Sequence, residues 1–147
     1  LEGVELIGKN SFCNCDKIAG TLSIPNSVIT IGEYAFNNCS SITGDLVFPK
    51  NDSLTIHRSA FYSCDINCIY FPSQTFVDGG TVFSNCLSLT RIVFDGFSAV
   101  PSDWWSATIF TSASEIGTVY SQNSDVPSST FLSFAKSKGL PNGWTTE

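Results

Sequence analysis

The sequence predicts a solenoid of about five stacked coils, and three observations support this prediction. Phenylalanine recurs at nearly constant spacing, a cysteine follows each copy by three residues, and a short alternating apolar run comes further on. The marker phenylalanines, spaced by 24, 25 and 22 residues, are Phe12, Phe36, Phe61 and Phe83. A unit of about 23 residues cannot bury its own apolar face, so copies of it must stack and share one core.

Each copy carries the same parts at the same offsets from its phenylalanine. The cysteines three residues later are Cys15, Cys39, Cys64 and Cys86, and the small or branched residues one position earlier are Ser11, Ala35, Ala60 and Val82. Four positions earlier stand Gly8, Gly32, His57 and Gly79. The apolar runs fall at 22–25, 46–49, 69–72 and 92–95. A weaker fifth copy contains Phe110, Ala113 in place of the cysteine, Ile116 and Val119.

Composition agrees with one folded domain. The chain has 147 residues, of which 42% are apolar and 14% charged, so it can bury a sizeable core. A net charge of -6 with only 7 Lys and Arg argues against a nucleic-acid partner. No apolar run is long enough to span a bilayer, so we expect no membrane insertion. The chain begins at Leu1 and lacks methionine, so we expect a fragment or processed form with further coils before residue 1.

Within a coil, the run "LSIP" predicts a short β-strand. Its period of two points Leu22 and Ile24 into the core and Ser23 outward. Pro25 lacks an N–H and ends the strand. Gly32 provides either a turn with positive φ or a close approach of two backbones. The segment 35–39 that follows is predicted to be a short turn or a helical piece.

The repeat resembles the BspA-type leucine-rich repeat, a family of bacterial and protist surface proteins. Residues 22–46, "LSIPNSVITIGEYAFNNCSSITGDL", follow the family pattern L-x-x-I-x-I-P-x-x-V-x-x-I-G-x-x-A-F-x-x-C almost position for position. The resemblance implies a leucine-rich-repeat solenoid of about five coils of 22–27 residues, each with a short strand in a parallel sheet. It also implies a surface-exposed binding module without catalysis, often in adhesion to host or matrix proteins such as fibronectin and fibrinogen.

The array is expected to cover residues 1–121, and a cap to cover 122–147. The stretch "PSSTFLSFAKSKGLPNGW" predicts a short helix with Ser128 or Ser129 as N-cap and Gly139 just beyond its end. Terminal coils of a solenoid need a cap to cover their exposed apolar surface. The residues expected to cover the last coil are Phe131, Phe134, Ala135 and Trp144.

The six cysteines admit a metal site, disulfides or buried thiols. Cys13-x-Cys15 and Cys64-x-x-x-Cys68 have half-site spacings for zinc. Four cysteines belong to the repeat, however, where Cys serves as a small buried hydrophobe. Equivalent residues of stacked coils point their Cβ atoms in parallel, which disfavours disulfides. We therefore expect reduced thiols and no metal or other cofactor, with Cys13 and Cys68 facing solvent as the more reactive pair.

No catalytic residues are predicted. His57 is the only histidine and occupies a turn position of the repeat, beside Arg58 and near Asp52. A solvated turn residue therefore explains it better than acid–base catalysis. The sequence contains no G-x-S-x-G elbow and no phosphate-binding glycine motif. We expect the chain not to be an enzyme.

The outward-facing strand positions form a candidate protein-binding surface. Stacked in two columns, they are Ser23, Asp45, Val47, Cys68, Tyr70, Arg91, Val93, Thr118 and Tyr120. Exposed tyrosine is enriched at protein interfaces. The alternative is that β-branched and aromatic residues occur here only because they favour strands. Trp104 and Trp105, in the insertion of the fifth copy, are either a second binding patch or packing over the last coil.

These observations favour a protein-binding module, and the family resemblance alone implies that it belongs to a bacterial cell-surface or secreted protein. The partner expected from the resemblance is an extracellular-matrix or host surface protein. The alternative is a structural spacer that holds another domain away from the cell. An enzyme would need a cleft with convergent polar groups.

Overall fold

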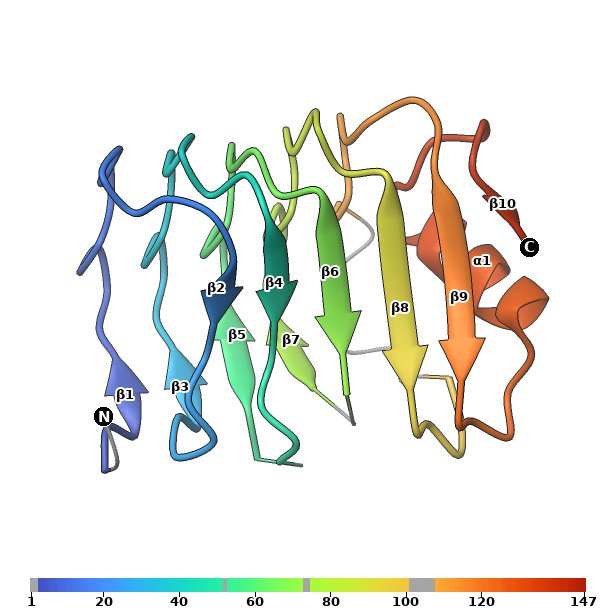
Figure 1. The fold of residues 1–147 in the computed structure, drawn as a ribbon, viewed down its shortest axis with the longest axis horizontal. Coiled ribbons are helices and arrows are strands. Elements are labelled where there is room, and N and C mark those ends of the chain that lie inside the picture. The colour runs from blue at the N-terminus through green and yellow to red at the C-terminus, as the bar shows by residue number, and fades with distance from the viewer. Residues whose placement is uncertain (1–2, 52, 73–74, 101–107) are drawn as a thin grey trace.

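The chain winds into about five stacked coils, closed at one end by a helix and a short strand (Figure 1). The computed structural model describes residues 3–51, 53–72, 75–100 and 108–147. This architecture confirms the predicted solenoid. Each coil repeats the previous one at the spacing of neighbouring parallel strands, about 4.8 Å.

One wall of the solenoid is the parallel sheet that the apolar runs predict. Its strands, in spatial order, are β2 (Leu22–Ser23), β4 (Asp45–Val47), β6 (Cys68–Phe71), β8 (Arg91–Asp95), β9 (Thr118–Gln122) and β10 (Thr145–Thr146). The register places Leu46 beside Ile69, Ile69 beside Ile92 and Ile92 beside Val119. All four side chains are fully buried. The alternation read from the sequence therefore gives the correct inward face.

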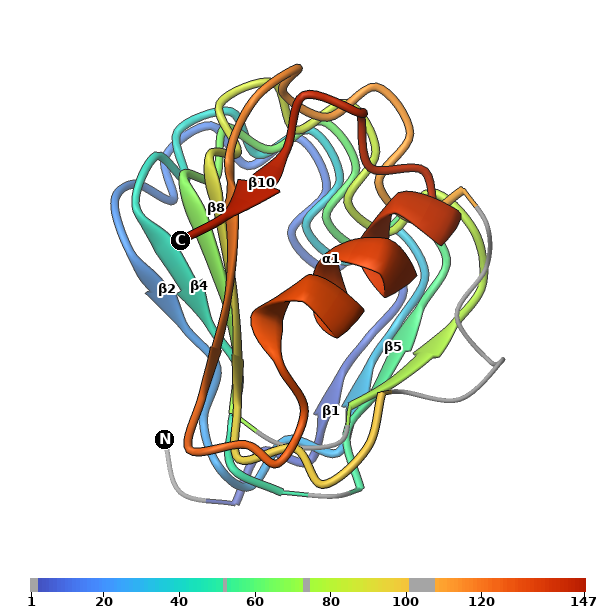
Figure 2. The same cartoon turned by 90° about the vertical axis from the view of Figure 1, so that its right-hand side faces the viewer.

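The opposite wall contains a second parallel sheet, which the sequence analysis did not predict (Figure 2). Its four strands are β1 (Leu6–Ile7), β3 (Thr30–Ile31), β5 (Thr55–His57) and β7 (Phe76–Asp78). Strands of two or three residues carry too little alternation to be recognised in a single copy. Their inward residues include Ile31, Ile56 and Val77, which are fully buried.

The marker phenylalanines form a continuous stack through the core. Successive ring centroids of Phe12, Phe36, Phe61, Phe83 and Phe110 lie 5.1, 5.2, 5.7 and 5.7 Å apart. A second stack joins Phe48 to Phe71 and Phe71 to Phe94, at 5.3 and 5.4 Å. The two stacks meet edge to face, for example between Phe48 and Phe61 at 5.7 Å. Both arrangements are favoured by the aromatic quadrupole.

The segment around each marker phenylalanine is a turn and not a helical piece. Its amides alternate between bonds within the coil and bonds to the next coil, as in Phe36 N to Ala60 O at 2.8 Å. The residues two positions before and after the phenylalanine adopt left-handed backbone conformations, with φ 56° at Tyr34 and 58° at Asn38. Asparagine tolerates this region better than most residues. It recurs here as Asn10, Asn14, Asn38 and Asn85.

The repeated cysteines donate hydrogen bonds to the phenylalanine carbonyls of the preceding coil. Cys39 Sγ lies 2.9 Å from Phe12 O, and Cys64 Sγ lies 3.0 Å from Phe36 O. Cys86 makes the equivalent bond to Phe61 O at 3.3 Å. Burial raises the pKa of each of these three thiols. All six cysteines are free thiols in the structure.

Gly32 is required for a close approach of two backbones and not for a positive φ. A Cβ atom at this position would lie 2.7 Å from Lys9 N and 2.9 Å from Gly8 C. These distances are shorter than van der Waals contact, so a larger residue would push neighbouring coils apart. The structure thus decides between the two roles that the sequence left open.

The C-terminal segment caps the last coil as predicted. Helix α1 (Ser128–Ser137) buries Phe131 and Ala135, and Phe131 stacks on Phe94 with ring centroids 4.3 Å apart. Trp144 is 1% exposed, and its Nε1 donates to Ser114 O at 2.8 Å. Phe134, also predicted to cover the coil, is half-buried against the core.

The predicted ends of this helix are correct at one end only. At its C-terminus, Gly139 has φ 94° and donates to Lys136 O, while Leu140 N donates to Ala135 O, which is a Schellman motif. The N-cap is Pro127 and not a serine. Ser128 Oγ instead accepts a hydrogen bond from Ser121 N at 2.9 Å, so it ties the cap to β9.

At the other end of the solenoid, the first coil leaves apolar surface uncovered. Leu6 is 62% exposed and Phe12 39% exposed. Together with Ile18 and Leu22 they line an apolar hollow of about 420 Å³. The phenylalanine stack is therefore open at Phe12 and closed at the helical cap.

Truncating the middle of the stack should destabilise the fold strongly. Phe61 is fully buried between Phe36 and Phe83, so Phe61→Ala should lower the free energy of unfolding by about 3–5 kcal/mol. The milder Phe61→Leu should cost about 1–2 kcal/mol. Urea denaturation followed by circular dichroism measures both, with the neighbouring, 37% exposed Tyr62→Ala as control. Equal stabilities of Phe61→Leu and Tyr62→Ala would contradict the proposed importance of the stack.

Candidate protein-binding surface

The outer face of the six-stranded sheet carries the predicted columns in the predicted register. Val47 pairs with Tyr70, Tyr70 with Val93, and Val93 with Tyr120. The second column runs through Asp45, Cys68, Arg91 and Thr118. Ser23 precedes Val47 at the edge of the sheet. The structure thus brings all nine residues onto one face.

Two of the nine are not available at the surface. Val93 is 1% exposed and Cys68 is 8% exposed. Val93 lies between Tyr70 and Tyr120 in the register, and the side chains of Tyr70 on β6 and Gln122 on β9 meet across β8 in a hydrogen bond. Alternation alone predicts which side of a sheet a residue faces, but it does not predict coverage by larger neighbours on the same side.

Arg91 and Tyr120 form the most prominent pair on this face. The guanidinium of Arg91 lies 4.4 Å from the centroid of the Tyr120 ring, a cation–π contact. Tyr120 Oη donates to Glu147 Oε1 at 3.1 Å. Arg91 is exposed and Tyr120 half-buried, so a partner can reach both side chains while the ring stays fixed.

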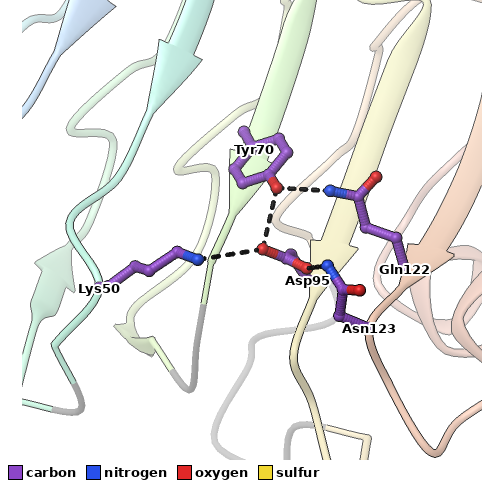
Figure 3. A network of polar contacts seen from close by, with 5 residues as sticks. All are labelled: Lys50, Tyr70, Asp95, Gln122 and Asn123. Atoms are coloured by element: carbon purple, nitrogen blue, oxygen red, sulfur yellow. Dashed lines mark hydrogen bonds and ion pairs between the residues drawn. The ribbon is translucent and has the colours of Figure 1, made fainter.

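Beside this pair, a polar network crosses several coils (Figure 3). Asp95 is at its centre and is 3% exposed. Its carboxylate accepts hydrogen bonds from Asn123 Nδ2 at 2.8 Å and Tyr70 Oη at 2.9 Å. Lys50 Nζ lies 3.5 Å from the same carboxylate, and Gln122 Nε2 donates to Tyr70 Oη. We call these five residues the Asp95 network.

Ionisation of Asp95 is favoured by this network. Burial opposes the charged form, but the hydrogen bonds from Asn123 and Tyr70 and the ammonium of Lys50 outweigh it. The pKa of Asp95 therefore lies below its ordinary value. The pKa of Tyr70 is raised, first by burial and then by its hydrogen bond to the Asp95 carboxylate. Both shifts keep Tyr70 as the donor and Asp95 as the acceptor at neutral pH.

The Asp95 network was not predicted, although the sequence contains a signal for it. The first three apolar runs end in proline, at Pro25, Pro49 and Pro72, whereas the fourth ends in Asp95. A charged residue at a position that is proline in the other coils indicates a local change of environment. Its partners lie on strands that only the register brings together, so no spacing in the sequence identifies them.

Within the described part of the chain, the remaining residues singled out from the sequence form no chemical centre. Trp104 and Trp105 lie outside the described residues. His57 Nδ1 lies 3.2 Å from Asp78 Oδ2, a partner that the sequence analysis did not identify. Among the described residues, no cluster of three or more His, Cys, Asp or Glu side chains is arranged to hold a metal ion. The same ranges contain no helix with the length and apolar character needed to cross a bilayer.

Comparison with known proteins agrees with the repeat and the fold. The family model for the BspA type leucine rich repeat region matches residues 5–132 in six copies. The chain belongs to this family. No curated protein matches its sequence.

Two solved structures resemble this BspA-type array. A leucine rich cell surface protein from Faecalibacterium prausnitzii A2-165 is 16% identical with a TM-score of 0.53, and the match covers 78% of this chain. A leucine-rich repeat protein from Bacteroides ovatus ATCC 8483 is 23% identical with a TM-score of 0.46, over 84% of this chain. The match spans only 40% and 41% of those two chains.

The prediction that Cys13 and Cys68 both face solvent and are the more reactive thiols is wrong for Cys68. Its thiol is buried in β6, and burial raises its pKa to about 11. Cys13 and Cys15, in the first coil of the BspA-type array, are partly exposed. The reactivity of each thiol should therefore depend on its solvent access and its fraction of thiolate. Whether the cysteine lies at a repeated position should not decide it.

Alkylation should distinguish these thiols in the native chain. Because burial raises the pKa of Cys68 to about 11, little of this buried thiol is thiolate at pH 8, so iodoacetamide should modify Cys13 and Cys15 first and Cys68 only after unfolding. Mass spectrometry of proteolytic peptides after a short exposure gives the order, and a denatured sample is the control. Modification of Cys68 as fast as Cys13 in the native protein would contradict its burial.

Replacing Asp95 should make stability less dependent on pH. The pKa of Asp95 is depressed in the folded state, so its contribution is complete above the unfolded pKa of about 3.9 and is lost as the pH falls through the lower folded pKa. Asp95→Asn should cost about 1–3 kcal/mol at pH 7. The difference from the wild type should shrink at acidic pH.

Urea denaturation across pH 2–7, read by circular dichroism, measures this dependence. Asp45→Asn is the matched control, because Asp45 is exposed on the same sheet and makes no ion pair among the described residues. Identical pH profiles for the two variants would show that the Asp95 network does not stabilise the fold.

Proposed function

We propose that this chain is a protein-binding module of a cell-surface or secreted protein, and that it binds through the outer face of the six-stranded sheet. Family membership supports a cell-surface repeat protein, and one similar structure is that of a leucine rich cell surface protein. The partner class that the family resemblance suggests is an extracellular-matrix or host surface protein. Binding on this face requires shape and polar complementarity and no catalytic step.

The single observation that carries the proposal is the cation–π pair of exposed Arg91 and half-buried Tyr120 on the outer face of a hydrogen-bonded sheet. Arginine and tyrosine are among the residue types that contribute most to binding energy at protein interfaces. Asp45 and Thr118 provide polar groups in the same column as Arg91. The Asp95 network fixes Tyr70 beside the pair, so little conformational entropy is lost when a partner binds.

Removing the pair should weaken binding strongly without unfolding the chain. We expect saturable binding of the wild-type chain to immobilised fibronectin, fibrinogen or laminin, and at least about tenfold weaker binding by Arg91→Ala/Tyr120→Ala. The matched control is Thr30→Ala/Thr55→Ala, on adjacent strands of the four-stranded sheet. Surface plasmon resonance gives the affinities and circular dichroism the folded state. Tyr70 is left intact, because its loss would also disrupt the Asp95 network.

A structural spacer is the second candidate, and the regular stacking of coils favours it. Backbone hydrogen bonds join every pair of neighbouring strands in both sheets, which makes the array stiff. A spacer requires no binding by the outer face. Absence of saturable binding to all three matrix proteins, or equal affinity of both double variants, would contradict the adhesion proposal and favour the spacer.

A further inference from the structure

A second surface with binding chemistry lies on the turn side of the coils. The turn segments continue the wall of the four-stranded sheet, across the core from the six-stranded sheet (Figure 2). On this side the third, fourth and fifth coils line an open hollow of about 210 Å³. Its lining includes Tyr62, Thr81, Ser84, Asn85, Thr111 and Ser112. We call it the turn hollow.

The hollow exists because a small residue lies between two larger ones. Tyr62, Ser84 and Thr111 directly follow the marker phenylalanines of three consecutive coils, so they are equivalent positions. Ser84 is 3% exposed and its Oγ donates to Thr108 O at 2.7 Å, so it forms the floor. Tyr62 is 37% exposed and forms a wall with an accessible aromatic ring.

The backbone holds this hollow in place. Ser63 N donates to Ser84 O, and Asn85 N donates to Thr111 O, both at 3.0 Å. Asn85 and Ser112 are in left-handed conformations, with φ 60° and 57°. The lining residues therefore lie on hydrogen-bonded turns and not on a free loop, which favours a preformed site.

The described residues of the lining are neutral and rich in hydroxyl groups. None of them carries an acidic or basic side chain. Among the described residues, the hydroxyl groups of Tyr62, Thr111 and Ser112 make no hydrogen bond of their own. Asn85 Nδ2 donates to Ser63 Oγ at 3.0 Å, which leaves the side-chain oxygen Oδ1 of Asn85 as a free acceptor. A charged ligand would lose its hydration here without gaining a counter-charge.

We propose that the turn hollow binds one ring of a neutral saccharide. Hydroxyl and amide groups both donate and accept, and so do the hydroxyl groups of a sugar. The Tyr62 ring offers an apolar face for the C–H groups on one side of a pyranose, and its hydroxyl a polar end. The volume is below the roughly 300–1,000 Å³ of sites for drug-sized molecules, which suits a single ring. A hexose has about 12 non-hydrogen atoms, and each contributes about 0.3 kcal/mol to binding. The expected dissociation constant of the sugar is therefore near 1 mM.

Saturation-transfer NMR with methyl glycosides tests this assignment in the whole chain. We expect transfer to at least one of the methyl glycosides of glucose, galactose, mannose and N-acetylglucosamine, with shifts of the Asn85 and Ser112 amides in a titration. Tyr62→Ala should weaken binding about fivefold or more, and Tyr62→Phe should retain most of it. Tyr34→Ala is the control, because Tyr34 lies in a turn of the second coil and does not line the hollow.

Three results would overturn the proposal. The first is absence of saturation transfer for all four glycosides at several times the expected dissociation constant. The second is binding that Tyr62→Ala leaves unchanged while circular dichroism shows a folded chain, because the sugar would then bind elsewhere. The third is a Ser- and Asn-containing peptide that shifts the same amides when no sugar does, which would assign the hollow to a peptide.

Discussion

The hydrogen-bonded spacing of the coils is the constraint on which the rest of this structure depends. Parallel strands lie about 4.8 Å apart, so every side chain has the equivalent residue of the next coil as its neighbour. A position in the repeat must therefore accept a residue type that packs against itself. Phenylalanine meets this condition by stacking at 5.1–5.7 Å. Cysteine meets it because its side chain is small enough to fit between neighbouring coils and its thiol can donate a hydrogen bond to a carbonyl of the preceding coil.

Residues that depart from the repeat change their neighbours in the same register. Asp95 replaces the proline of the earlier runs, and its buried carboxylate is stabilised by hydrogen bonds from Tyr70 and Asn123 and by the ammonium of Lys50. Ser84 is smaller than the tyrosine of the coil before it, and the turn hollow results. The Asp95 network and the turn hollow therefore both arise where the repeat is irregular, while the regular positions maintain the core.

The sequence was sufficient to predict the repeat, the inward face of the six-stranded sheet and the helical cap, because each leaves a periodic or terminal pattern. It was insufficient for the four-stranded sheet, whose strands are as short as Leu6–Ile7 and Thr30–Ile31. On the outer face it identified the side of the sheet correctly. It missed the burial of Val93 and Cys68, because coverage depends on how neighbouring side chains such as Tyr70 and Gln122 meet across the sheet.

Burial of Val93 changes how the outer face can act in recognition. The Tyr70 hydroxyl is occupied by Asp95 and Gln122, so Tyr70 contributes a fixed surface and few new hydrogen bonds. The Arg91 guanidinium is held over Tyr120 and remains exposed, so it is the group with donors left to offer. A partner that matches this arrangement presents a carboxylate or carbonyl oxygen towards Arg91 and apolar surface towards Tyr70 and Val47. Because the strands and the Asp95 network already order these side chains, discrimination between partners depends on that match more than on adjustment of the sheet.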